Sequence, residues 1–259
     1  MSNRRFFLKN SALFFPLLGG VYGCSTQIKK NFITKKNIGS VVVVGGGFSG
    51  ATLAKYLSIW SNGAVKVTLI EKNKFFYSCP MSNLVLGGVK RFNFIKHNFD
   101  NLVKRGVNVV NDEVVFIDPE KKIVTTRTGL TFRSDKIVVS PGIDFRHHEI
   151  EGLTPSAQRR VLHGWTAGAQ TMALRAQLMS MTNGDVFIIS IPPAPYRCPP
   201  GPYERACQVA SYFKKHKPRS KVVILDANAD IQSKKSLFLN VWKSLYKNII
   251  EYIPNTEIS

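Results

Sequence analysis

Acidic side chains are scarce in this sequence, which has 16 Asp and Glu against 36 Lys and Arg and a formal net charge of +20. Such an excess is compatible with nucleic acid, an anionic membrane or an acidic protein as a partner. The basic residues are scattered, however, and the densest run, Lys214–Lys221, lacks the interleaved aromatic residues of single-stranded nucleic-acid grooves. We therefore predict no nucleic-acid partner and interpret the charge as a solvated, Lys-rich surface, with electrostatic docking as the alternative.

The apolar stretch near the N-terminus, Ala12–Tyr22, is too short to be a membrane span, which needs about 20 apolar residues. It follows Arg4-Arg5-Phe6-Phe7-Leu8-Lys9, and a twin-arginine pattern before a short apolar stretch is typical of an export signal. We expect residues 1–24 to be a twin-arginine signal segment and residues 25–38 to be a linker. The sequence thus predicts a periplasmic protein without a membrane span.

Cysteine is also rare, with only Cys24, Cys79, Cys198 and Cys207 in the chain. Their spacings match no metal-binding pattern, so we predict no metal site. An oxidising compartment would permit disulfides. Cys24 ends the sequence VYGC, which loosely resembles a lipoprotein cleavage box, so this residue is either lipidated or lost with the signal.

A glycine-rich segment is the most informative feature of the sequence. The run Val41–Val44 is typical of a buried parallel strand, and an expected helix, Ala51–Trp60, follows the glycines. A second strand, Val65–Ile70, ends at Glu71, which lies 26 positions after the first loop glycine, close to the interval expected for a ribose-binding acid. The pattern predicts a dinucleotide site, with a purely structural glycine turn as the alternative. Its expected ligands are Gly45, Gly46, Gly47, Phe48, Ser49, Gly50 and Glu71.

The remaining pattern predicts an α/β fold with a Rossmann-like cofactor-binding domain, residues 39–150, and an incomplete second Rossmann-like domain, residues 151–259. In the second domain, the expected strand Val186–Ile191 leads into a proline-rich segment, Pro192–Pro202. Proline has no N–H to offer a phosphate. A nicotinamide cofactor is therefore not expected there. Other expected elements are strands at Val107–Val110, Asp112–Ile117, Lys122–Thr126, Lys136–Val139 and Lys221–Asp226, and a helix at Ala167–Met181.

Three segments carry a resemblance to a known family: Phe76–Gly88, Val139–Phe145 and Ala194–Ala206. Together they resemble the flavoprotein subunit of flavocytochrome c sulfide dehydrogenase, one of the two-dinucleotide-domain flavoproteins, and the resemblance extends over essentially the whole chain. It implies oxidation of sulfide with FAD and electron transfer to a c-type cytochrome subunit. The glycine loop would then bind FAD, with Pro141 and Gly142 as further cofactor-binding residues.

The resemblance also implies roles for two cysteines. Cys79 occupies the position of the cysteine that forms a thioether with the flavin 8α-methyl carbon, and Cys198 that of one half of a redox disulfide; the alternative is an inert cysteine in each case. Either Arg197 or Arg205 would favour a thiolate at Cys198.

The sequence departs from the family in having no evident second redox cysteine. Pro202 is expected to open a helix with Cys207 in its second turn, which places Cys207 poorly for a bridge to Cys198. The family's partner cysteine lies in a C-terminal region beyond Ser259, so we expect a truncated gene, an incomplete sequence or a decayed gene. Two alternative functions stay open: a sulfide:quinone oxidoreductase and a non-catalytic truncated remnant.

Overall fold

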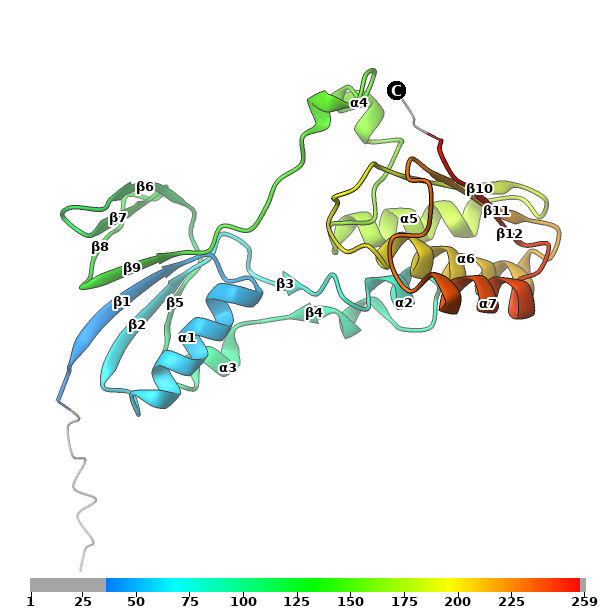
Figure 1. The fold of residues 1–259 in the computed structure, drawn as a ribbon. Helices are drawn as coiled ribbons and strands as arrows, with labels where there is room; N and C mark the ends of the chain where they lie inside the picture. Colours follow the sequence, from blue (N-terminus) through cyan, green and yellow to red (C-terminus); the bar gives the residue numbers. More distant parts are fainter. Residues whose placement is uncertain (1–35, 257–259) are drawn as a thin grey trace, which may run out of the picture. The chain divides into compact units, whose positions relative to one another are not determined.

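The computed structural model describes residues 36–256, shown as a ribbon in Figure 1. The predicted signal segment and nearly all of the predicted linker lie outside the described residues, and so does Cys24. Two parallel sheets organise the described part, one formed by strands before residue 150 and one by strands after it. The predicted α/β class with parallel sheets is confirmed.

The first sheet has four parallel strands in the order β5-β2-β1-β9. In the central strand β1, Val43 packs with Ala54 on one face and Val42 packs with Val124 on the other. Adjacent side chains of a strand point to opposite faces, so a run of valines fits burial on both sides, as predicted. The elements are β1 (Gly39–Val44), α1 (Phe48–Trp60), β2 (Val65–Ile70), α3 (Asp100–Val103), β5 (Asn108–Val110) and β9 (Lys136–Val139).

An antiparallel three-stranded sheet lies between β5 and β9 in the chain: β6 (Val114–Asp118), β7 (Ile123–Thr126) and β8 (Thr131–Arg133). The first two strands match the predicted ones within two residues at each end. The third was not predicted, because three residues carry too little alternation to be recognised.

Residues 76–97 form an arm between β2 and α3. Its two ends pair antiparallel as the short strands β3 (Phe76–Tyr77) and β4 (Lys96–His97). Between them lie α2 (Ser82–Leu86) and a 3-10 turn (Phe92–Phe94). Helix α2 contacts α5 (Ala169–Ser180) and α6 (Gly201–His216) of the second sheet's core, and its Leu86 is 2% exposed in that core. The range predicted as the cofactor domain therefore contributes a helix to the core around the second sheet.

The second sheet has three parallel strands in the order β10-β11-β12. Helices α5, α6 and α7 pack on one of its faces, whereas Ile188 on the other face is 60% exposed. Before them the chain forms a 3-10 turn (His147–Glu149) and a short helix, α4 (Pro155–Gln158). The other elements are α5 (Ala169–Ser180), β10 (Val186–Ile191), α6 (Gly201–His216), β11 (Lys221–Asp226), α7 (Lys235–Leu245) and β12 (Ile250–Ile253).

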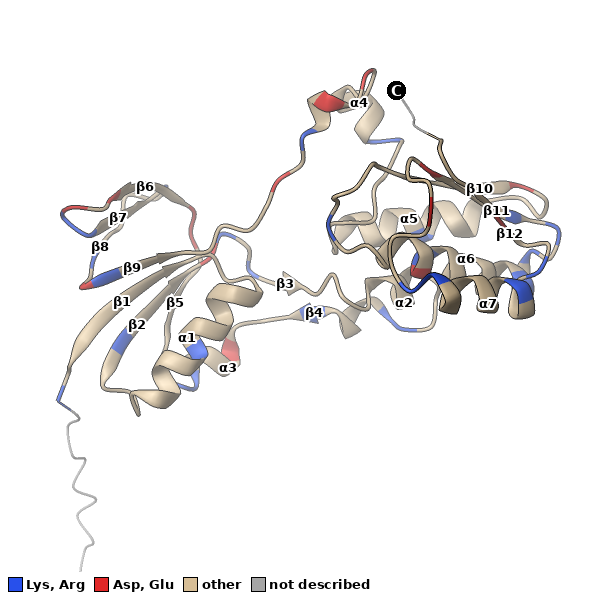
Figure 2. Ribbon diagram, viewed as in Figure 1, with Lys and Arg blue, Asp and Glu red and all other residues tan. Residues whose placement is uncertain are grey.

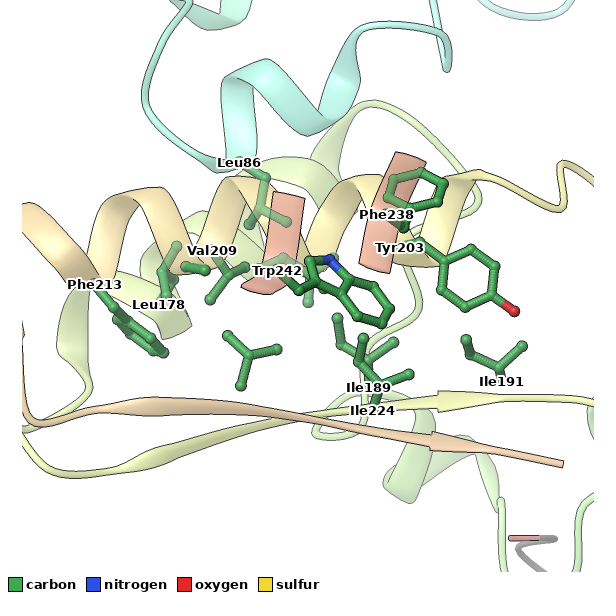
Figure 3. Close-up of a cluster of buried hydrophobic side chains, with 14 of the residues drawn as sticks. Leu86, Leu178, Ile189, Ile191, Tyr203, Val209, Phe213, Ile224, Phe238 and Trp242 are labelled. Atoms are coloured by element: carbon green, nitrogen blue, oxygen red, sulfur yellow. The ribbon is translucent and has the colours of Figure 1, made fainter. Parts of the chain in front are cut away.

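Figure 3 shows how the core of the second sheet is filled. Helix α6 runs along the strands and lies between them and the Leu86 side chain of α2. Its buried side chains recur every three or four positions, including Tyr203, Val209 and Phe213, which is the spacing of one helix face. The helix begins at Gly201, one residue before the predicted start at Pro202.

Among residues 36–256, no helix is both long and apolar enough to cross a bilayer. Figure 2 shows Lys and Arg spread over elements of both sheets, in agreement with their scatter along the sequence.

Candidate functional site

The glycine loop connects β1 to α1 in a tight turn. Gly45 has a φ of +96°, and a Cβ at this position would lie 2.2 Å from the Ser140 carbonyl oxygen. Only glycine meets both conditions without strain. At Gly50, a Cβ would lie 1.9 Å from the Gly45 carbonyl oxygen, so this glycine allows the helix to approach the strand closely. Both positions have the local geometry that a dinucleotide-binding turn requires.

Gly47 differs from these two glycines. A Cβ at Gly47 would have no heavy atom within 4 Å, so the backbone here faces open space. No side chain caps the start of α1, and its first turn has no acidic residue. The first amides of a helix lack partners within the helix and carry partial positive charge. Together these features fit the diphosphate of a dinucleotide, with Phe48 and Ser49 supplying amides beside Gly47.

Glu71 closes the loop from the end of β2. Its Oε2 accepts the Gly46 N–H at 2.6 Å, and its Oε1 accepts the backbone and side-chain N–H groups of Asn73, both at 2.8 Å. A carboxylate has about four acceptor positions, so one position on Oε2 is left for a ribose hydroxyl. Glu71 therefore also holds the glycine loop in place. This role was not predicted from the sequence.

The turn after β9 lies beside the glycine loop because β9 pairs with β1. The Ser140 N–H donates to the Val44 carbonyl at 2.7 Å, and the Ser140 hydroxyl is 3.5 Å from that of Ser49. Pro141 and Gly142 follow at once and are both exposed, and Gly142 has a φ of +86°. The structure therefore brings these two predicted residues to the same edge of the sheet as the loop.

A pocket of about 170 Å³ opens on the helix side of the loop, and its walls are mostly apolar. Ring side chains from three elements contribute to it: Phe48 from α1, Phe76 from the arm, and Phe99 from the residue before α3. Phe48 and Phe76 meet edge to face, with 4.9 Å between ring centroids. Apolar walls with aromatic rings beside the uncapped amides at the start of α1 suit an aromatic ligand such as a nucleotide base.

Cys79 lies on the arm just before α2 and is half-buried. Its thiol is 3.3 Å from the Trp165 carbonyl oxygen, to which it donates. Burial raises the pKa of the Cys79 thiol, the neighbouring Cys198 sulfur raises it further, and the Arg205 and Arg197 guanidinium groups lower it. Cys79 and Cys198 are therefore within electrostatic reach of each other although they are far apart in sequence.

Cys198 is exposed and sits in the proline-rich segment just before α6. Its backbone has a φ of 58°, a conformation that residues other than Gly and Asn rarely adopt. Its carbonyl accepts the Gly201 N–H at 2.9 Å, and a Cβ on Gly201 would lie 3.3 Å from the Cys198 sulfur and 3.6 Å from the Trp165 ring. The sulfur and the ring thus both lie against Gly201. Strained backbone of this kind is concentrated at functional sites.

Cys207 does not join this group. Its sulfur accepts the Trp242 indole N–H at 3.3 Å, and it packs against the core of the second sheet. Cys198 and Cys207 are both free thiols in the structure, and the poor placement of Cys207 for a bridge stays a prediction.

Arg205 is one of the two arginines expected to favour a thiolate at Cys198, but its burial was not predicted. It belongs to α6, is 9% exposed, and donates from Nε to Asn83 Oδ1 at 3.2 Å and from an Nη to the Gly164 carbonyl at 2.8 Å. A signal was present in the sequence, because Arg205 falls on the apolar stripe of α6 between Pro202 and Val209.

His163 is within electrostatic range of the same guanidinium. Its ring lies 4.3 Å from that of Phe145 and 6.1 Å from that of His147, measured between centroids. Burial lowers the pKa of His163, and the charges of His147 and Arg205 lower it further. Within residues 36–256, no three or more His, Cys, Asp or Glu side chains are grouped as metal ligands would be.

A glycine turn with this geometry on a parallel sheet is typical of a Rossmann-type protein, and a second site places Cys79 and Cys198 both near Trp165. Comparison with known families agrees. The model of the pyridine nucleotide-disulphide oxidoreductases matches residues 39–189, and that of the central part of the sulfide dehydrogenase [flavocytochrome c] flavoprotein chain matches residues 171–259. The chain belongs to the pyridine nucleotide-disulphide oxidoreductase family, and the resemblance to the flavocytochrome c flavoprotein is confirmed.

Individual relatives include the mitochondrial sulfide:quinone oxidoreductases of Dictyostelium discoideum, 25% identical over 72% of this chain, and Mus musculus, 24% identical over 74%. The matched regions are 41% and 42% of those proteins, so the chain spans less than half their length. Among solved structures, the sulfide:quinone oxidoreductase of Aquifex aeolicus has a TM-score of 0.68 at 23% identity, over 83% of this chain and 51% of that one. This last likeness shows the fold alone.

Proposed function

We propose that this chain is the flavoprotein part of an enzyme that oxidises sulfide with FAD. The observation that carries the proposal is the convergence of Cys79 and Cys198 beside Trp165 and Arg205, since two thiols and a buried cation suit chemistry on an anionic sulfur. The family match over residues 171–259 and the sulfide:quinone oxidoreductase relatives support sulfide as the substrate.

FAD supplies the site with an acceptor for two electrons. Its diphosphate would lie on the amides of Gly47, Phe48 and Ser49, because the backbone there is open and uncapped. Glu71 would accept a ribose hydroxyl on its remaining oxygen position. The Pro141-Gly142 turn is proposed as a further contact, because it shares the sheet edge with the loop.

Cys79 is proposed as the attachment point for the flavin. Its sulfur would hold the cofactor through a thioether to the 8α-methyl carbon, a two-electron oxidation for which the flavin itself would be the acceptor. The position on the arm supports this role, because the arm is held to the second core by α2 and leaves the sulfur only half-buried.

Cys198 is proposed as the sulfur that reacts with the substrate. With FAD bound as the two-electron acceptor, hydrosulfide and the Cys198 thiolate would form a sulfur–sulfur bond with release of one proton. The exposed, strained position of Cys198 supports this role, since a substrate can reach it from solvent.

The electron acceptor is proposed to be a c-type cytochrome subunit, which takes the two electrons one at a time, and the protein is proposed to be exported through its twin-arginine segment. A quinone is the second candidate, because the relatives named above are sulfide:quinone oxidoreductases.

The test begins with the purified full chain, precipitated in acid to show whether flavin absorbance stays with the protein. Cys79→Ser serves as the matched variant, because it should bind FAD but release it in acid. Sulfide is then supplied with either cytochrome c or a soluble quinone as acceptor. Faster reduction of cytochrome c supports the proposal, faster reduction of the quinone assigns the alternative acceptor, and no sulfide-dependent reduction of the bound flavin identifies a non-catalytic remnant.

A further inference from the structure

Arg205 is a buried cation without an anionic partner in contact. Both of its hydrogen-bond acceptors, Asn83 Oδ1 and the Gly164 carbonyl oxygen, are neutral. None of the ion pairs within residues 36–256 involves it. Burying a charge is costly unless it is paired, so an anionic group beside Arg205 would be stabilised by it and would stabilise it in turn.

The backbone around Arg205 is shaped to fit the guanidinium. A Cβ on Gly164 would lie 2.1 Å from the Arg205 Cζ, so the guanidinium occupies the space that a side chain at this position would take. On its other side, Asn83 accepts from Arg205 and donates its Nδ2 to the Gly201 carbonyl at 3.3 Å. Arg205 therefore joins three segments: the arm that carries Cys79, the loop before α5, and the start of α6.

Three ionisable groups act electrostatically on this cation: the Cys79 and Cys198 thiols and the Glu204 carboxyl group. Burial lowers the pKa of the Arg205 guanidinium, and Cys79, Cys198 and Glu204 act on it in the opposite direction. Glu204 is exposed, whereas Cys79 is half-buried, so the charge of Cys79 is the less screened by water. The groups that act on Cys79 or on Arg205 from the surrounding elements are Ser82, His163, Arg197, Cys198 and Glu204.

We propose that Arg205 is the positioning residue of the cysteine pair: it holds the Cys79 arm against α6 and supplies the positive charge that stabilises Cys79 as a thiolate for attachment of the flavin. The inference rests on the proposed function only in taking Cys79 as a reactive thiol. The claim that the buried Arg205 charge controls the reactivity of Cys79 can be tested without sulfide, cytochrome or bound flavin.

The experiment compares three variants of the full chain with the parent. Arg205→Met removes the charge and keeps an apolar stem, and Arg205→Lys keeps a charge. Arg175→Met is the matched control, because Arg175 also ties α5 to the arm, donating to the Leu86 carbonyl at 3.0 Å, but is not among the groups that act on Cys79 or His163. Folding is checked by near-UV circular dichroism.

Two readouts are measured in each variant. The first is the pH dependence of alkylation of Cys79 by neutral iodoacetamide, followed by peptide mass spectrometry on the flavin-free fraction of the protein. The second is the pKa of His163, followed by NMR. An opposite charge nearby lowers an acid's pKa by about one unit or more, so Arg205→Met should slow alkylation of Cys79 near neutral pH about tenfold and shift its profile to higher pH. The pKa of His163 should rise in the same variant, because a repelling cation has been removed.

The rate of Cys79 alkylation in Arg205→Met distinguishes an effect of the Arg205 charge from a purely structural role of the residue. If Arg205 only tethers the arm, its loss exposes Cys79, burial no longer raises the pKa, and alkylation becomes faster. Faster or unchanged alkylation in a folded Arg205→Met protein, or an equal effect of Arg175→Met, would overturn the inference. Slower alkylation that Arg205→Lys restores supports it. Neither result depends on turnover of sulfide, so a failure of the proposed function would be seen separately, as absent flavin reduction.

Discussion

Removing the Tyr203 hydroxyl should destabilise the core of the second sheet, because this hydroxyl donates a hydrogen bond to the fully buried carboxyl group of Asp226. Asp226, at the end of β11, has no exposed surface and accepts four hydrogen bonds. They come from Tyr203 at 2.7 Å, Tyr252 at 3.1 Å, and the backbone and side-chain N–H groups of Asn228 at 3.0 and 2.7 Å. The Tyr203 hydroxyl also accepts the Gln232 N–H at 3.2 Å.

The size of the effect follows from these contacts. Tyr203→Phe keeps the ring, which is fully buried, so no cavity larger than one oxygen forms. A hydrogen bond to a charged group contributes about 1.5–3 kcal/mol, and leaving the Gln232 N–H without its acceptor adds roughly 1 kcal/mol. We expect the free energy of unfolding in urea to fall by about 3 kcal/mol with an unchanged m-value.

Tyr212→Phe is the matched control. The Tyr212 ring is only partly buried and lies 4.7 Å from the Arg175 guanidinium, and this stacking does not need the hydroxyl. Its loss should change stability by less than about 0.5 kcal/mol. A Tyr203→Phe protein within about 1 kcal/mol of the parent would refute the reasoning, because the Asp226 network would then not contribute to stability.

The same network predicts a pH dependence. Burial raises the pKa of Tyr203 well above its ordinary value. The unfolded chain therefore releases the phenolic proton first, near pH ~10, and unfolding becomes easier as the pH rises beyond that point. Below this pH the contribution is fully present. Above it, the stability of the parent should fall more steeply with pH than that of Tyr203→Phe, as measured by urea denaturation at a series of alkaline pH values.

Four further substitutions test the fold and the site. Gly45→Ala should lower the free energy of unfolding in urea by at least about 2 kcal/mol, because the new Cβ clashes with the Ser140 carbonyl and the residue keeps a left-handed φ. Gly47→Ala should fold normally but bind FAD more weakly in a flavin titration. Lys217→Met should cost about 2–3 kcal/mol, because the buried ammonium donates to the Leu178, Met179 and Met181 carbonyls at the end of α5; an unchanged unfolding midpoint would contradict this. Cys198→Ser should retain flavin yet lose its bleaching by sulfide in an anaerobic spectrum, and persistent bleaching would remove Cys198 from the chemistry.

The glycine loop could be predicted from the sequence because its determinants are local. A valine run, closely spaced glycines and an acid at the end of the next strand fix a strand, a turn and a helix within about 30 residues. The structure has this arrangement from Gly39 to Glu71. The additional role of Glu71, as acceptor of the Gly46 amide, is a side-chain contact that no spacing rule encodes.

The convergence of Cys79 and Cys198 depends on tertiary structure. It is produced by the arm, whose strands are two residues each and whose helix is five residues long, too short to leave a periodic signal. Helix α7 was missed for a different reason. Its Phe238 and Trp242 have the spacing of one helix face, so a signal was present in the sequence and was not used.

The most direct test of the account is to locate flavin on the protein. Full-length protein, produced with its cofactor and precipitated in acid, is digested, and the flavin-bearing peptide is identified by fluorescence and mass spectrometry. The account predicts one flavinylated peptide, containing Cys79, and none in Cys79→Ser. Flavin that is released by acid, or that is attached to a peptide without Cys79, would contradict the account.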